Sequence, residues 1–120
     1  MYQIKPPFNV SIAALAAGVE AIKDIQWTKK AIDHNALWAK KIFSVLKEHN
    51  VKTNEPAVNF FLMIFDEAKI NSDQVFEKLA ADKLIVRKMI QYKISNSLRL
   101  TIGNKEANEN FIKSMGSILK

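Results

Sequence analysis

The spacing of apolar residues changes along the chain, and its period predicts where helices and strands lie. In residues 11–24 the apolar side chains recur every three or four positions, as on one face of a helix: Ile12, Leu15, Ala16, Val19 and Ile22. Ser11 precedes them and is a favoured N-cap residue. Pro6 and Pro7 exclude helix from residues 1–10, so this segment predicts an extended connector.

A longer helix is predicted over residues 25–50, because two sets of apolar residues follow the helical period. One set forms a stripe that predicts burial: Trp27, Ala31, Trp38, Ile42 and Val45. The other set lies more than a quarter turn away: Ile32, Ala36, Ala39, Phe43 and Leu46. A helix that is apolar on two sides needs cover on both, either from neighbouring helices or from a partner, another domain or a second subunit. The pattern alone leaves both alternatives open.

Three later segments follow the pattern of strands. Residues 58–65 are continuously apolar apart from Asn59, which predicts a central strand buried on both faces. Residues 84–87 form a short strand, and residues 98–102 alternate apolar with polar side chains. This alternation places Arg99 on the side of its strand that faces away from the core.

Two helices complete the order of elements. Asn71 or Ser72 caps the first, which ends near Ala81, and Asn104 caps the second, which begins at Lys105. The order predicts a two-layer α/β (α+β) sandwich, in which helices pack on one face of a small mixed sheet.

The length of 120 residues predicts one domain. We divide it into a connector over residues 1–10, two helices over residues 11–50, and a sheet with helices over residues 51–120.

Composition excludes several classes of function. The chain has no cysteine, so disulfides and thiolate metal sites are excluded, and it has no apolar run long enough to cross a membrane. Its start lacks the apolar core of a secretory signal, so we expect a cytoplasmic location. The net charge of +6 comes from scattered lysines rather than from one cluster, which argues against nucleic-acid binding.

Arginine is rare in this basic chain. Of 18 basic residues, only Arg87 and Arg99 are arginine. A planar guanidinium binds carboxylate or phosphate through two parallel hydrogen bonds, which the lysine ammonium does not do. Both arginines are therefore candidate anion-binding residues, and ordinary surface or ion-paired arginines are the alternative.

Groups that indicate catalysis are sparse. His34 and His49 lie far apart on one predicted helix, without a second metal ligand at helical spacing, so we expect structural roles for both and no metal site. Asp66 and Glu67 follow a predicted strand, but no partner group is specified, so we expect solvated carboxylates. The residues by themselves predict binding groups and no catalytic residue.

Four segments, in their order along the chain, resemble the C-terminal part of histidinol-phosphate aminotransferase. This family belongs to the class I/II (fold type I) pyridoxal-phosphate-dependent aminotransferases. The resemblance covers nearly the whole chain and implies the small-domain fold of these enzymes. It rests on Pro6-Pro7-Phe8-Asn9-Val10-Ser11, on Asn59-Phe60-Phe61-Leu62, on Ile85-Val86-Arg87, and on Leu98-Arg99-Leu100-Thr101-Ile102-Gly103 with Glu106 and Asn108 after it.

The resemblance implies roles for three residues. Arg99 is similar to the arginine that holds the carboxylate or phosphate of the substrate, and Arg87 is similar to a second anion-binding arginine. Asn59 matches a position for which we expect a structural role. No catalytic, cofactor-binding or metal-binding residue is implied within this chain.

The resemblance also implies a missing part. In the family a large domain supplies the Schiff-base lysine and the other residues that bind pyridoxal 5′-phosphate, and we find none of those motifs here. We expect a fragment that is inactive and without cofactor when alone. In a full-length homodimer it would serve histidine biosynthesis by amino transfer between L-histidinol phosphate and 2-oxoglutarate. The preference for this or another amino donor stays open, and a freestanding protein-interaction module of the same fold is the alternative.

Overall fold

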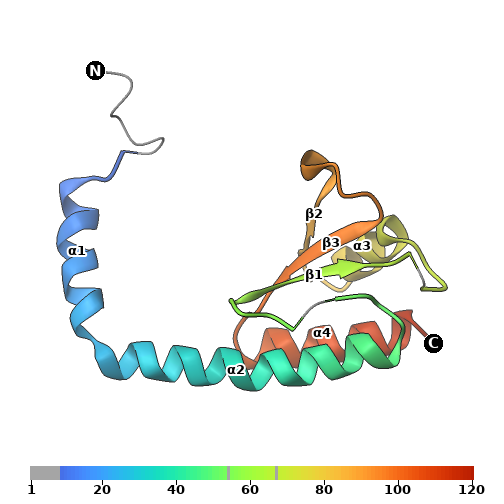
Figure 1. Ribbon diagram of the computed structural model, residues 1–120, viewed down its shortest axis with the longest axis horizontal. Coiled ribbons are helices and arrows are strands. Elements are labelled where there is room, and N and C mark those ends of the chain that lie inside the picture. The colour runs from blue at the N-terminus through green and yellow to red at the C-terminus, as the bar shows by residue number, and fades with distance from the viewer. Residues whose placement is uncertain (1–8, 54, 67) are drawn as a thin grey trace. The chain divides into compact units, whose positions relative to one another are not determined.

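A computed structural model describes residues 9–53, 55–66 and 68–120 (Figure 1). The chain divides into two compact units, Met1–Asp33 and His34–Lys120. The first unit contains α1 (Ile12–Lys23) and the beginning of α2 (Ile25–Glu48), and the remaining elements belong to the second unit. Most of the expected connector over residues 1–10 lies outside the described residues.

Helix α1 begins where the sequence predicts. The Ser11 hydroxyl accepts a hydrogen bond from the backbone N–H of Ala14 at 3.1 Å, so Ser11 is the N-cap. No residue of α1 is buried. The large side chains of its apolar stripe are between 54% and 87% exposed: Ile12, Leu15, Val19 and Ile22. The helix is therefore confirmed, and its stripe is free of cover among the described residues.

Helix α2 is buried only in its second half. Trp38, Ile42 and Leu46 are buried at four-residue intervals. The predicted stripe is partly wrong, because Trp27 is 69% exposed and Leu46, from the other predicted set, takes the last buried position. The physical reason is that the core belongs to the second unit, which α2 enters only at His34.

Among the described residues, three strands form one sheet in the order β1-β3-β2. They are β1 (Phe60–Ile64), β2 (Arg87–Lys88) and β3 (Ser97–Thr101). Both pairs are antiparallel, so the prediction of a mixed sheet is wrong for these strands, while the two-layer α/β class is confirmed. The connection from β2 to β3 is short, and a short connection joins antiparallel neighbours rather than parallel ones.

Strand β1 is not the central strand that the apolar run predicts. It pairs with β3 on one side, and on the other side the described residues give it only an isolated bridge between Ile64 and Lys52. Burial alternates along it: Phe61 and Met63 are buried, whereas Phe60 is 41% exposed. The run is continuous because the less buried face of β1 also carries apolar side chains. The central strand is β3, which pairs with both neighbours.

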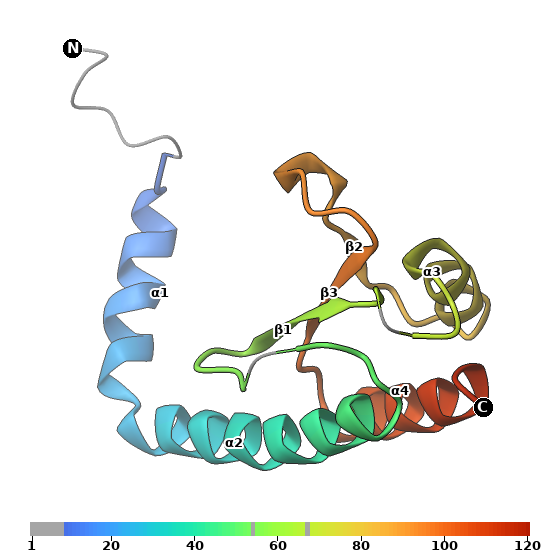
Figure 2. The same ribbon diagram turned by 45° about the vertical axis from the view of Figure 1, so that its right-hand side comes forward.

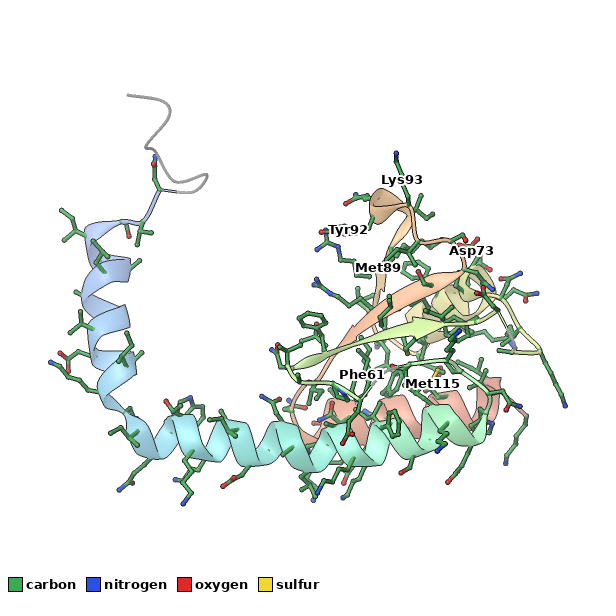
Figure 3. All side chains as sticks on the ribbon, viewed as in Figure 1. Phe61, Asp73, Met89, Tyr92, Lys93 and Met115 are labelled. Atoms are coloured by element: carbon green, nitrogen blue, oxygen red, sulfur yellow. The ribbon has the colours of Figure 1, made fainter. Side chains whose placement is uncertain are left out.

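The core of the second unit lies between one face of the sheet and its helices, as predicted. Figures 1 and 2 show α4 (Lys105–Ile118) beside the second half of α2, below the sheet. Phe61 and Met115 project into the space between β1 and α4 (Figure 3). The fully buried side chains of this core come from both layers: Ile42, Leu46, Phe61, Met63, Phe65, Val75, Leu79, Leu98, Phe111 and Met115.

The N-terminal caps of the last two helices are also as predicted. Asn71 caps α3 (Ser72–Ala81) in a capping box with Gln74, and Asn104 caps α4 by accepting a hydrogen bond from the N–H of Ala107 at 2.9 Å. Over the part of the chain that the structure describes, no helix has the length and apolar character needed to cross a membrane.

Candidate anion-binding site

The sheet register brings the two arginines together. Arg87 of β2 and Arg99 of β3 are direct cross-strand partners, and Leu62 of β1 pairs with Arg99 on its other side. Side chains that are directly opposite on antiparallel strands lie on the same face of the sheet. We call the face that carries Leu62, Arg99 and Arg87 the outer face, because the neighbouring residues Leu98 and Leu100 point into the core.

Arg99 is held on the outer face but lacks a hydrogen-bond partner at one atom. Its side chain is partly buried, and its guanidinium carbon lies 5.2 Å from the centroid of the Phe60 ring. A cation–π contact uses the face of the guanidinium, so it gives no acceptor to the N–H groups, which point within the guanidinium plane. The Nε atom is buried and has no hydrogen-bond partner among the described residues. A buried donor without an acceptor costs about 1–3 kcal/mol, so an acceptor that reaches this atom would stabilise the site.

Arg87 is exposed and has neutral partners from the 3-10 turn η2 (Ile90–Tyr92). One terminal nitrogen donates long hydrogen bonds to Gln91 Oε1 at 3.5 Å and to the Tyr92 hydroxyl at 3.4 Å. The guanidinium carbon lies 5.5 Å from the centroid of the Tyr92 ring, which lies at the tip above β2 (Figure 3). These contacts orient the guanidinium without neutralising its charge.

Neither arginine belongs to an ion pair among the described residues, whose ion pairs are all made by lysines. Two like charges at directly opposite positions destabilise a pair of strands. A carboxylate or phosphate between them would remove this repulsion and accept hydrogen bonds from both. The arrangement is therefore chemically suited to bind an anion.

The end of β3 is fixed by hydrogen bonds at Gly103. The buried Asn108 side chain closes a ring with this residue: its Oδ1 accepts from Gly103 N–H and its Nδ2 donates to Gly103 O, each at 2.9 Å. His34 Nε2 lies 2.8 Å from the same carbonyl oxygen. His34 thus has the structural surroundings that its sequence context predicts, and the turn after Arg99 is rigid.

The other candidate groups are not brought to the arginines. Asp66 accepts a long hydrogen bond from Asn96 Nδ2 at 3.4 Å, and Glu67 lies outside the described residues. The Asn59 carbonyl accepts from Ile102 N–H at 2.8 Å and extends the pairing of β1 with β3. Within the ranges that the structure describes, no three His, Cys, Asp or Glu residues gather where they could hold a metal ion.

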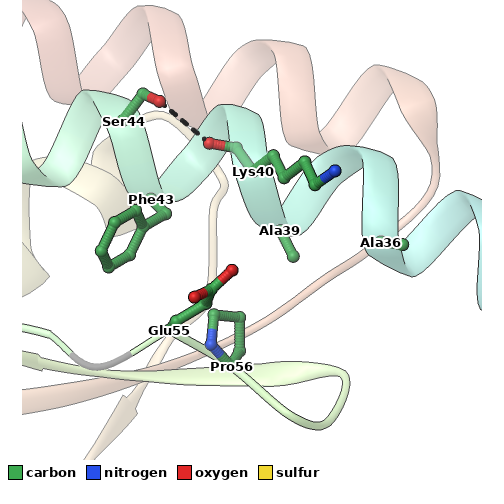
Figure 4. Close-up of a pocket in the computed structure, with 7 residues that line it drawn as sticks. All are labelled: Ala36, Ala39, Lys40, Phe43, Ser44, Glu55 and Pro56. Carbon is green, nitrogen blue, oxygen red and sulfur yellow. Dashed lines mark hydrogen bonds between the residues drawn. The ribbon is translucent and has the colours of Figure 1, made fainter.

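A separate groove lies between α2 and residues 55–56 (Figure 4). It has a volume of about 420 Å³, and neither arginine lines it. The Ser44 hydroxyl on its rim donates to the backbone carbonyl of Lys40 at 3.1 Å, so the hydroxyl is engaged within its own helix. Its other lining residues are Ala36, Ala39, Phe43, Glu55 and Pro56. The groove therefore adds no group to the site.

Three residues beside the arginines were given no role from the sequence. Phe60 and Tyr92 stack on the guanidinium groups, and Lys88 lies next to Arg87 on β2. Phe60 contacts Arg99 through the pairing of β1 with β3, which sequence spacing does not reveal. Tyr92 follows Arg87 closely in the chain. An aromatic residue at this spacing from a candidate arginine is a local signal that could have predicted their contact.

Comparison with known proteins identifies the class. Residues 1–115 match the model of the family described as aminotransferase class I and II, and the chain belongs to this family. Histidinol-phosphate aminotransferases are among its similar relatives. The enzyme of Pelagibacter ubique is 37% identical over 119 residues, which are 98% of this chain and 33% of the relative. The enzyme of Campylobacter jejuni subsp. jejuni serotype O:6 is 37% identical over 99% of this chain and 32% of its own length.

Solved structures agree with this assignment at the level of the fold. The histidinol-phosphate aminotransferase of Clostridium acetobutylicum superposes with a TM-score of 0.79 at 16% identity, over 97% of this chain and 35% of that one. A putative aminotransferase of Burkholderia pseudomallei gives a TM-score of 0.81 at 15% identity, over 99% of this chain and 36% of that one. The family resemblance found in the sequence is thus confirmed, and the chain spans about a third of the length of these curated relatives.

Proposed function

We propose that this chain is the small domain of a pyridoxal-phosphate-dependent histidinol-phosphate aminotransferase, where it binds the anionic group of the substrate. The family membership and the similar relatives support the enzyme class. The observation that carries the proposed role is the pairing of Arg99, with its buried and unpartnered Nε, directly opposite Arg87 on the outer face.

In this proposal Arg99 binds the substrate phosphate, or a carboxylate when the amino acceptor is bound. A guanidinium matches either anion because its two parallel donors meet two oxygens of the anion. Arg87 donates to the same anion from the neighbouring strand. A phosphate carries a charge of about −1.5 to −2 at neutral pH, which two permanent cations balance.

The cofactor would be held outside this chain. None of the described lysines is buried, so none has the enclosed surroundings that suit a lysine bound to pyridoxal phosphate. When bound to the rest of the enzyme, the cofactor supplies the electron sink that amino transfer needs. The residues of this chain hold the substrate by its anion and so fix the orientation of its amino group. Movement of this domain toward the remainder of the enzyme would exclude water from the site.

The missing partner in this proposal is a large domain. The relatives are about three times as long as this chain, and α1 exposes an apolar stripe. Exposed apolar stripes mark surfaces that another chain or domain covers. We assign that cover to the large domain of the enzyme, which we expect to act as a homodimer in the cytoplasm, in the synthesis of histidine.

The proposal is tested by assaying amino transfer from histidinol phosphate to 2-oxoglutarate in the presence of pyridoxal phosphate. We expect no activity and no borohydride-reducible cofactor adduct with the 120-residue chain alone. Joining the chain to a large domain should restore both. Activity of the chain alone, or no activity of the joined protein with histidinol phosphate, would contradict the proposal.

A freestanding protein-interaction module is the second candidate function. The exposed stripe of α1 favours it, because a helix that binds a separate partner protein needs such a surface. The coding sequence before Met1 discriminates between the two candidates. An in-frame large domain with a cofactor-binding lysine supports the aminotransferase, and its absence supports the module.

A further inference from the structure

Strand β2 carries Arg87 but is only two residues long, Arg87–Lys88. Pairing with β3 over two residues provides few hydrogen bonds to hold the strand in place. The position of Arg87 therefore also depends on other contacts of β2 and its flanking residues, among them those of Lys88.

Lys88 makes two such contacts with α3. Its Nζ lies 2.6 Å from Asp73 Oδ1 and 4.6 Å from the centroid of the Phe76 ring. The other ion pairs of the described residues join positions within a single helix. The pair of Lys88 and Asp73 is the one among them that joins two elements, and the Lys88 side chain in it is 38% exposed.

The face of the sheet on which Lys88 makes these contacts determines the face on which Arg87 lies. Lys88 pairs with Leu98, which is fully buried, so both lie on the helix side of the sheet. Successive residues of a strand point to opposite faces, so holding Lys88 against α3 holds Arg87 on the outer face beside Arg99.

The part of α3 that Lys88 contacts is itself attached to β3. The backbone N–H of Ser72, at the start of α3, donates to the Asn96 side-chain oxygen at 2.7 Å, and Asn96 immediately precedes β3. The N-terminal half of α3, which carries Asp73 and Phe76, is thus tied to the strand that carries Arg99. Through its contacts with Asp73 and Phe76, Lys88 connects β2 to the same part of α3.

We propose that Lys88 is a positioning residue for Arg87: its ion pair with Asp73 and its contact with Phe76 hold β2 so that both guanidinium groups meet one substrate anion. This inference rests on the proposed anion-binding role of Arg87 and Arg99. Lys88 itself does not contact the substrate, because it lies on the opposite side of the sheet.

The test uses the complete aminotransferase that contains this chain and compares histidinol phosphate with histidinol, which lacks the phosphate. Lys88→Met keeps an apolar side chain over Phe76 but removes the charge. It should raise KM for histidinol phosphate about fivefold, as loss of about 1 kcal/mol predicts. The inhibition constant of histidinol and kcat should stay unchanged. Lys105→Met removes a surface ion pair within one helix, with Glu109 of α4, and should change none of these constants.

A second comparison asks whether Lys88 acts through Arg87. In an Arg87→Ala background, Lys88→Met should raise KM for histidinol phosphate no further, because the positioned group is already gone. The charge exchange of Asp73→Lys with Lys88→Asp should restore part of the lost affinity. Asp73→Asn removes the same ion pair from its other partner and should raise KM for histidinol phosphate selectively in the same way. This variant keeps the test decisive if Lys88→Met fails to fold.

The outcomes separate this inference from the function on which it rests. If Arg87→Ala leaves KM for histidinol phosphate unchanged, the anion-binding role itself is wrong. If Arg87→Ala raises KM but Lys88→Met and Asp73→Asn do not, only the positioning role is overturned. An equal loss of affinity for histidinol and histidinol phosphate would also overturn it, because that result indicates general destabilisation.

Discussion

Arg99 is the residue on which anion binding depends. Its side chain leaves a rigid central strand between two core residues, Leu98 and Leu100, and it is pressed against Phe60. One of its donors is buried and finds no acceptor in the part of the chain that the structure describes. A donor that is fixed in advance loses little side-chain freedom when the anion binds, so this position suits tight and oriented binding.

Substitution of Arg99 tests this role in the complete enzyme. Arg99→Ala should raise KM for histidinol phosphate about 100-fold, since two charge-assisted hydrogen bonds of about 1.5 kcal/mol each are lost. Arg99→Lys should recover little of this loss, because an ammonium does not reproduce the planar pair of donors. Lys113→Ala, which removes an exposed cation from α4, serves as the control. An unchanged KM in both Arg99 variants would remove this residue from the site.

Asn108 carries a structural prediction at the same scale. Asn108→Ala leaves both polar groups of Gly103 without their partner and should lower the free energy of unfolding by about 2–3 kcal/mol. Urea titration of the 120-residue chain measures the loss. Asn110→Ala, at an exposed position of the same helix, is the matched control. Equal midpoints for the two variants would show that the ring of hydrogen bonds at Gly103 contributes nothing.

At the scale of elements, the helices and two of the strands could be predicted from the sequence, whereas the pairing of the strands could not. A helix is specified locally, by a cap such as Ser11, Asn71 or Asn104 and by a period of apolar residues. Strand order and register are set by pairing between distant segments, which the pattern does not contain. The alternation around Arg99 therefore predicted its face correctly, whereas its position opposite Arg87 became visible only in the structure.

The N-cap residues also differ in how much they contribute to the stability of the second unit. Asn104→Ala should lower the stability of the second unit by about 1 kcal/mol, because α4 packs Phe111 and Met115 into the core. Ser11→Ala should leave that stability unchanged, since α1 buries no residue. Denaturation followed by Trp38 fluorescence in a Trp27→Phe background measures both variants. A loss of core stability in Ser11→Ala would contradict the independence of α1.

At the scale of the whole molecule, the chain corresponds to one part of its longer relatives. It spans about a third of their length and exposes the apolar stripe of α1. The resemblance found in the sequence predicted the family, which the comparisons confirm, whereas the large domain stays a proposal. The exposed start of α2 was not predicted, because a helical period does not reveal which part of a helix another domain covers.

The exposed stripe leads to a prediction about assembly. Leu15→Asp should prevent stable association with the large domain, because it introduces a charge into an apolar interface. It should leave the urea midpoint of the second unit unchanged. Ala17→Asp, on the opposite side of α1, should leave association intact. Co-purification of separately tagged domains measures this, and equal association of both variants would remove the stripe from the interface.

The most direct test of the proposed site uses the rarity of arginine in this chain. Because Arg87 and Arg99 are the only arginines, ¹⁵N NMR of the 120-residue chain should resolve one Nε–H signal for each. During titration with histidinol phosphate, both signals should shift along one saturable curve, and neither should shift with histidinol. If neither signal moves at saturating histidinol phosphate, or if the two follow different curves, the two arginines do not form one anion-binding site.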